Sequence, residues 1–373
     1  MKKRFVSLLL TAVMCVSLIA CGSTANTSES TTTSSETENE VEEAETTDSN
    51  EEEANADSTV EPLNIVFAIM EYPDEPQDIW MKTFVEKVDE LSGGAITVET
   101  HYCGELGDGS DQIELIQSNV INMGTVDSGP AAVLIPEVGV LALHWMMPET
   151  YDDMYNFLDN AESIQMIDGL FADAGLEVVT WETEGANFWT ADRPLETPED
   201  FAGFNMRTME NPLIEASYKA YGANATVISF SELYSALQLG TVDGEINPAS
   251  VIYSSKFYEV QDYLIQPVAD YNFYSVVVNS DFYAGLTDAQ KAVIEEAIAE
   301  ASADYREKVE QNEADSLDTL VNECGMTLIT LTEEQRQALK ELSGSVQEEY
   351  VQIAGGKSQE ILDQFIEDLE TLE

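Results

Sequence analysis

One arginine, Arg207, is the residue of this chain best suited to bind a small anion. It stands in the segment FNMRTME, shortly before a stretch that reads SELYSALQLGTVDGEINP. A guanidinium group stays protonated and presents a planar set of donors that matches a carboxylate. The neighbouring sequence is rich in Asp and Glu, so an ordinary ion pair is the competing interpretation. From residue type alone, Arg207 is either a carboxylate ligand or part of a structural ion pair.

Side chains that could support catalysis or bind a metal do not form a distinctive motif. His101 and His144 are the only histidines, and neither lies in a metal-ligand or nucleophile pattern. Asp108 and Asp111 could contact calcium, but the twelve-residue loop with its bidentate Glu is absent. Two of the 72 acidic residues could form a hydrolase pair, although no pair stands out. We therefore expect no enzyme activity, catalytic residue, cofactor or metal site, and keep a secreted acidic hydrolase as the alternative.

The charge of the chain limits its partners. It has 72 acidic and 15 basic residues, and its formal net charge is −57 at pH 7. Such a charge disfavours nucleic acids and anionic lipid surfaces. It also opposes an anionic ligand at long range. A pocket for an anion must therefore depend on a local cation and on backbone dipoles.

The first twenty residues predict an export signal. Three basic residues precede the apolar run Phe5 to Ala20, which is short for a membrane span. The run ends in LIACG, which resembles the lipobox of bacterial lipoproteins; this resemblance implies cleavage before Cys21 and a diacylglyceryl group on its sulfur. Two acyl chains anchor a protein stably. We expect an extracytoplasmic protein held at the cell membrane through Cys21, with an ordinary signal peptide as the alternative.

Residues 21–61 predict a disordered tether. They are rich in Ser, Thr and acidic side chains and contain no Lys or Arg, so they cannot bury enough apolar surface to fold. Beyond the tether, Cys103 and Cys324 are the only cysteines and lie far apart in sequence. This spacing predicts two free thiols, with a single long-range disulfide as the alternative.

From residue 62 onward the pattern alternates between strands and helices. Period-two or continuous apolar runs predict strands at residues 63–69, 95–102, 176–182, 225–230, 273–279 and 326–331. Capping sequences mark helix starts at Thr197-Pro198, Ser229, Thr287 and Thr332. A helical stripe over residues 288–323 predicts one unusually long helix, with a kink near 311–314 as the alternative. The alternation predicts an α/β protein, and the length predicts two lobes.

Several segments resemble a known family. They are TPEDFAGFNMR (197–207), YGANATVISFSELYSALQLGTVDGEINP (221–248), KFYEVQDYL (256–264), LSGGAITVETHYCGELG (91–107) and LTDAQKAVIEEA (286–297). The family is the DctP-type extracytoplasmic solute-binding proteins of TRAP transporters. The resemblance implies a periplasmic-binding-protein-like α/β fold, with two lobes joined by β-strand hinges and crossed by a long helix. On this basis we expect lobe I to contain residues 62–184 and 273–312, and lobe II residues 185–272 and 313–373.

The same resemblance implies roles for particular residues. Arg207 is expected to pair with the ligand carboxylate, Phe230 to pack on the ligand and Asn247 to hydrogen-bond it; core packing and a turn are the structural alternatives for Phe230 and Asn247. Asn187 stands where many relatives carry a second arginine, which favours a monocarboxylate over a diacid. Positions beyond predicted strand ends add weaker candidates, namely Asn187 itself, Glu71, Tyr72, Asp127, Ser128 and Trp189.

The expected function follows from these features. We expect a lipid-anchored receptor that captures a small organic acid outside the cell and delivers it to the membrane subunits of a TRAP transporter. A lipoprotein that binds a non-carboxylate solute, or one that reports to a sensor, is the alternative within the same structural class.

Overall fold

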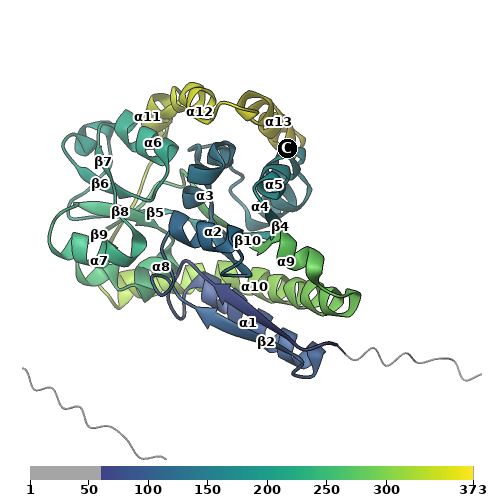
Figure 1. Ribbon diagram of the computed structural model, residues 1–373. Coiled ribbons are helices and arrows are strands. Elements are labelled where there is room, and N and C mark those ends of the chain that lie inside the picture. Colours follow the sequence, from purple (N-terminus) through teal and green to yellow (C-terminus); the bar gives the residue numbers. More distant parts are fainter. Residues whose placement is uncertain (1–59, 373) are drawn as a thin grey trace, which may run out of the picture. The chain divides into compact units, whose positions relative to one another are not determined.

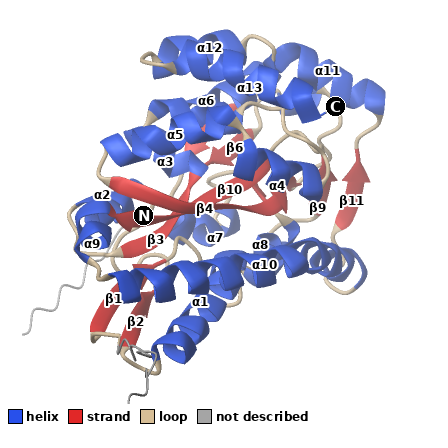
Figure 2. Ribbon diagram, turned by 90° about the vertical axis from the view of Figure 1, so that its right-hand side faces the viewer, coloured by secondary structure: helices blue, strands red, loops and turns tan. Residues whose placement is uncertain are grey.

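The computed structural model describes residues 60–372. The expected signal peptide, the expected lipidation site Cys21 and residues 21–59 of the expected tether lie outside the described residues. Within the described part, the strands form two sheets, and helices cover both faces of each (Figures 1 and 2). In residues 60–372, no helix combines the length and the apolar character that a bilayer span needs.

The first sheet has five strands in mixed orientation. Their order is β2 (Ile96–His101), β1 (Leu63–Ala68), β3 (Met123–Asp127), β10 (Tyr271–Asn279) and β4 (Leu176–Ala186). Strand β1 runs parallel to β2 and β3, whereas β10 is antiparallel to β3 and β4. Successive residues of β10 enter different cores: Tyr274, Val276 and Val278 face one cluster, and Phe273 and Val277 face the other. Apolar side chains on both faces explain why this strand reads as a continuous apolar run.

Two layers of helices enclose this sheet. On one face lie α1 (Pro76–Ser92) and α10 (Asp288–Asn322). The other face carries α2 (Ser110–Gln117), α3 (Ser128–Leu134), the 3-10 helix η1 (Pro136–Ala142), α4 (Tyr151–Asn160) and α5 (Glu162–Asp173). The short helix α9 (Ser280–Gly285) follows β10.

The second sheet has six strands. Their order is β11 (Thr327–Thr330), β9 (Tyr263–Gln266), β5 (Phe188–Ala191), β8 (Gly244–Asn247), β6 (Asn205–Thr208) and β7 (Asn224–Val227). One face packs against α6 (Pro212–Tyr221) and α11 (Glu333–Ser343), and the other against α7 (Phe230–Gln238) and α8 (Ala249–Ser254). Two 3-10 helices, η2 (Pro198–Phe201) and η3 (Phe257–Glu259), complete this lobe.

Before the C-terminal helices, three segments of the described chain connect the two lobes. Strand β4 continues through Asn187 into β5, and β9 returns through residues 267–270 into β10. The two connections touch: Asn187 donates its backbone N–H to the Asp270 carbonyl (3.0 Å) and its Nδ2 to Asp270 Oδ2 (2.7 Å). The third connection is α10, which is one continuous helix of 35 residues, as the apolar stripe predicts. The predicted two-lobe α/β architecture is confirmed.

The C-terminal helices link the outer sides of both lobes. Figure 1 shows α11, α12 (Val346–Ala354) and α13 (Ser358–Leu372) following one another from α6 to α5. Ile361 and Phe365 of α13 belong to the apolar cluster of the first sheet. The end of the chain therefore covers the first lobe, whereas the sequence-based division places residues 313–373 in lobe II.

Most of the expected capping sequences are observed. Thr287 with Gln290 and Thr332 with Gln335 form reciprocal capping boxes, and Thr197 with Asp200 forms one that opens a 3-10 helix. The prediction of a capping box at Ser229 is wrong. The Ser229 hydroxyl accepts no backbone N–H of α7 and instead donates to the Glu232 carboxylate (3.3 Å). The prediction of free thiols at Cys103 and Cys324 is confirmed.

Candidate functional site

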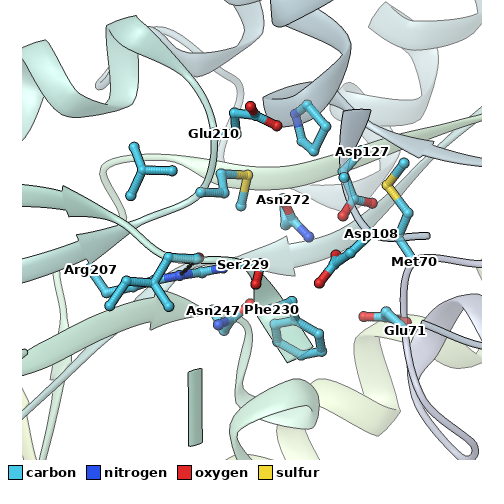
Figure 3. Close-up of a pocket in the computed structure, with 15 residues that line it drawn as sticks. Met70, Glu71, Asp108, Asp127, Arg207, Glu210, Ser229, Phe230, Asn247 and Asn272 are labelled. Carbon is cyan, nitrogen blue, oxygen red and sulfur yellow. Dashed lines mark hydrogen bonds between the residues drawn. The ribbon is translucent and has the colours of Figure 1, made fainter. Parts of the chain in front are cut away.

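A cavity of about 200 Å³ lies where the two lobes meet, beyond the strand ends (Figure 3). The first lobe contributes Met70 and Glu71 after β1, Asp127 at the end of β3, Asn272 of β10, Pro130 of α3, and Asp108 and Gly109 before α2. The second lobe contributes Arg207 of β6, Met209 and Glu210 directly after β6, and Asn247 at the end of β8. It also contributes the segment from β7 to α7, namely Val227, Ile228, Ser229 and Phe230. Both lobes thus form the walls.

Arg207 is a buried cation without a carboxylate partner. It is 2% exposed, and its Nε donates to the Ile228 carbonyl (2.9 Å). One terminal guanidinium nitrogen has no hydrogen-bond partner, and no carboxylate oxygen of residues 60–372 lies within 4.0 Å. Burial lowers the pKa of Arg207 to about 10, against the attraction of Glu245 and Asp108, so the group remains charged at neutral pH. The structural ion pair considered from sequence is not formed within the described residues.

Phe230 and Asn247 line the same cavity. Phe230 is the first residue of α7, and its ring stacks on Tyr72 with centroids 5.7 Å apart. The Nδ2 of Asn247 donates to Glu245 Oε2, which fixes the amide at the end of β8. Glu245 is fully buried and also accepts from Thr190 Oγ1 (2.8 Å); burial raises its pKa to about 7. Aromatic, amide and guanidinium groups therefore converge on one space.

Acidic side chains dominate the first-lobe wall. Gln77 connects Glu71 and Asp127 of this wall with Glu184, which does not line the cavity: its backbone N–H donates to Glu71 Oε2 (2.7 Å), and its Nε2 donates to Asp127 Oδ1 (2.7 Å) and Glu184 Oε1 (2.9 Å). Burial, with repulsion from Glu184, raises the pKa of Glu71 and of Asp127 well above the usual range. Burial also raises the pKa of Glu184. These carboxyls form no ion pair with Lys or Arg of the described chain.

Hydrogen bonds join the lobes around the cavity. Asp108 Oδ2 accepts from the backbone N–H (3.2 Å) and the hydroxyl (2.6 Å) of Ser231 at the start of α7. Ser110 Oγ donates to Glu210 Oε2 across the same gap (3.0 Å). Glu75 Oε1 accepts from the hydroxyls of Ser254 (3.1 Å) and Ser255 (2.6 Å) at the end of α8. The described structure is thus one in which the lobes are in contact.

The structure brings together five of the nine residues proposed from sequence. Arg207, Phe230, Asn247, Glu71 and Asp127 line the cavity.

The other four candidates lie elsewhere. Tyr72 stacks on Phe230 without lining the cavity, and Ser128 is buried at the start of α3. Asn187 is bonded to Asp270 at the hinge. Trp189 is fully buried and packs edge-on against Phe201, with centroids 5.2 Å apart. Strand alternation explains why the Trp189 side chain is buried. Strand β5 lies inside its sheet, and the side chain points into the apolar core on one face of that sheet.

Ten lining residues were not candidates from sequence. Five of them lie within three residues of Arg207 or Phe230, namely Met209, Glu210, Val227, Ile228 and Ser229. A wider window around these two residues would have included these five. Met70 directly precedes the candidate Glu71, and Pro130 lies three residues after the candidate Asp127. Only long-range packing brings the last three, Asp108, Gly109 and Asn272, to the cavity.

Comparisons with known proteins agree with the fold and the segments described. Residues 67–353 match the sequence model of the family described as bacterial extracellular solute-binding protein, family 7. The ectoine-binding periplasmic protein TeaA of Halomonas elongata is 33% identical over 310 residues, which cover 82% of this chain and 90% of that protein. The C4-dicarboxylate-binding periplasmic protein DctP of Rhodobacter capsulatus is 29% identical over 302 residues, covering 80% and 89%.

Two solved structures show the same similarity. The periplasmic ectoine-binding protein of the TeaABC TRAP transporter of Halomonas elongata superposes with a TM-score of 0.79 at 32% identity, covering 83% of this chain and 99% of the other. The sugar acid binding protein DctPAm of Advenella mimigardefordensis, in complex with galactonate, gives a TM-score of 0.80 at 28% identity, covering 84% and 100%. These relatives are named for binding and not for catalysis.

Proposed function

This chain belongs to the family 7 bacterial extracellular solute-binding proteins, the receptors of TRAP-type transporters, and we propose that it binds a small organic monocarboxylate through Arg207. Relatives are named for ectoine, for C4-dicarboxylates and for sugar acids. The family therefore accepts several ligands, and the residues of this cavity must supply the choice among them.

The unpaired Arg207 is the observation that supports the proposal. A buried charge without a partner costs several kcal/mol, because the protein does not replace the water that the charge loses. A ligand carboxylate would supply that partner in a fork-to-fork geometry. Arg207 is also the only Lys or Arg among the residues that line the cavity. One cation favours a ligand with one carboxylate.

Phe230 and Asn247 complete the proposed contact set. The Phe230 ring offers an apolar face for the body of the ligand, beside the side chains of Met70 and Met209. Asn247 retains a second amide hydrogen and a carbonyl oxygen for polar groups, since only one bond of its Nδ2 is used by Glu245. The ligand would thus be held at its carboxylate, over its body and at one polar substituent.

Contact between the lobes supports a capture mechanism. Asp108 lines the cavity and bonds to Ser231 of the other lobe, so the contact between the lobes limits the access of solvent to a ligand inside. Excluding water strengthens the pair between Arg207 and a carboxylate. A ligand favours this closed form only to the extent that it binds it more tightly than a separated form. Delivery therefore requires that the membrane subunits of the transporter stabilise the separated form.

Substitution of Arg207 tests the carboxylate proposal. The ligand is first identified by native mass spectrometry of protein purified without denaturation, and its affinity is then measured by titration calorimetry. In Arg207→Ala the affinity should fall at least about 30-fold, because a charged hydrogen-bonded contact contributes roughly 2 to 5 kcal/mol. Arg193→Ala, which changes an exposed arginine outside the cavity, is the matched control and should bind normally. Unchanged affinity in Arg207→Ala would refute the proposal.

The lipid anchor is a separate part of the proposed function. It rests on the LIACG sequence at residues 18–22, which resembles a lipobox. In Cys21→Ser the protein should move from the membrane fraction to the soluble extracytoplasmic fraction, because the acyl chains have no sulfur to join. Mass spectrometry of the mature N-terminus in the unaltered chain should show the diacylglyceryl group. Membrane association that persists in Cys21→Ser would contradict the anchor.

A further inference from the structure

The cavity has two sides of opposite charge. Figure 3 shows Arg207 on one side and Glu71, Asp108 and Asp127 on the other, with Phe230 between them. Together with Glu210, four carboxyl groups and a single cation line the space. A site built only to attract an anion would not carry this excess of negative charge.

The four carboxyl groups differ in the hydrogen-bond donors that the protein offers them. Asp108 and Glu210 already accept hydrogen bonds from the serines that join the lobes. Glu71, which is buried, and Asp127, which is half-buried, each accept one bond from Gln77, a neutral donor that also bonds to Glu184. Within the described chain no Lys or Arg reaches them within 4.0 Å. No cation of the described chain therefore balances the negative charge that Glu71 and Asp127 carry when they are ionised.

Titration behaviour is consistent with this reading. Burial and repulsion from Glu184 raise the pKa of both Glu71 and Asp127, which means that the ionised forms lack a compensating charge. The attraction of Arg207 for Asp127 opposes this shift and does not cancel it. A cationic group in the cavity would favour the ionised carboxylates and would gain from them in turn.

We propose that the ligand is a zwitterion, whose carboxylate binds Arg207 and whose fixed positive group binds between Glu71 and Asp127. This inference rests on the proposed role of Arg207. A quaternary ammonium or a protonated amidine fits, because the charge lies on a group that also packs against the Phe230 ring. A dicarboxylate does not fit, since its second carboxylate would face the acidic wall. A hydroxylated acid would bond to these oxygens but would leave their charge unbalanced.

Matched pairs of compounds test the positive subsite. Glycine betaine and 3,3-dimethylbutyrate have the same shape, and only the first carries a quaternary nitrogen. Ectoine and cyclohexanecarboxylate give a second pair with a six-membered ring, and D-glucuronate represents hydroxylated acids. Titration calorimetry of the full-length chain, freed of retained ligand, should show that at least one zwitterion binds tenfold or more tightly than its partner and than D-glucuronate. Tighter binding of the purely anionic members or of D-glucuronate would overturn the inference.

Variants separate this inference from the proposed function. The double variant Glu71→Gln, Asp127→Asn removes the negative charge while keeping the shape of both side chains. It should weaken the preferred zwitterion tenfold or more and leave the anionic partner unchanged or tighter. Glu86→Gln, on the exposed face of α1, is the control. If the double variant weakens the zwitterion and its anionic partner equally, the cation site is refuted and Arg207 remains the carboxylate ligand. If Arg207→Ala still binds both compounds with unchanged affinity, the proposed function itself fails.

The retained ligand gives a direct answer when no added compound binds. Native mass spectrometry, followed by fragmentation of the released molecule, identifies its functional groups. A ligand with both a carboxylate and a permanently or readily protonated nitrogen supports the inference, and a ligand without a positive group overturns it.

Discussion

Arg207 and Arg306 lie in different regions of the same molecule and are held in opposite ways. Arg306, in the middle of α10, donates its Nε to Glu182 Oε2 (2.9 Å) and its terminal nitrogens to both oxygens of Asp159 (2.7 and 3.0 Å). It also donates to the Trp181 carbonyl (3.0 Å) and lies 4.3 Å from the centre of the Tyr155 ring. Arg207 has one backbone acceptor and no carboxylate partner among residues 60–372.

The two arginines show how a structural cation and a binding cation can be distinguished. Burial opposes the charged form of Arg306, but its bonds to Asp159 and Glu182 outweigh this effect and raise its pKa. For Arg207, burial prevails and the pKa is lowered. A cation whose partners all belong to the protein stabilises the fold. A buried cation without such partners indicates that its counter-charge comes from outside.

Removal of Arg306 should have the largest effect on folding. Arg306→Ala leaves Glu182, which is fully buried, without its cation, and should lower the free energy of unfolding by about 3 kcal/mol or more. Ligand affinity, measured below the unfolding transition, should stay unchanged, because this residue lies outside the cavity. Urea denaturation followed by circular dichroism measures the loss.

The companion variant gives the opposite pattern. Arg207→Ala without ligand should unfold at the same or a higher urea concentration, because the substitution removes an unpaired buried charge. If Arg306→Ala reduced affinity and left stability unchanged, the distinction between the two arginines would be wrong.

A smaller effect should come from Arg207→Lys. Lysine keeps a positive charge but cannot form two parallel bonds to a carboxylate. The affinity for the native ligand should fall about tenfold, which corresponds to roughly 1.4 kcal/mol, and thus less than in Arg207→Ala. Calorimetry on both variants measures the ratio. A loss as large as that in Arg207→Ala would mean that the planar geometry, and not the charge, dominates.

Much of the fold was predictable because local patterns agreed with it. The 35-residue helix α10 follows from its apolar stripe and from the Thr287 capping box, both of which are local. For the cavity, the resemblance of residues 197–248 to the family identified Arg207, Phe230 and Asn247, and all three line it. Residues that act together within one motif keep their relative positions when the fold is kept.

The remaining site residues depend on information that a single sequence does not contain. Trp189 follows a strand end by position, yet the faces of β5 are set by its neighbours β8 and β9. Asn272 and Asp108 reach the cavity from segments far from the motif. Ser229 has the spacing of a cap, but its hydroxyl bonds to Glu232 instead. In each case tertiary contacts decide between two locally acceptable arrangements.

The long helix α10 limits how the lobes can move. Residues Val293 to Val309 pack into the core of the first lobe, and Leu320 packs into the core of the second. The helix extends about 52 Å at 1.5 Å per residue, and both of its ends are fixed by apolar contacts. The lobes therefore cannot slide apart along it without exposing one of these contacts. Their relative motion is restricted to rotation, so the largest solute that can enter is set by an angle and not by a distance of separation.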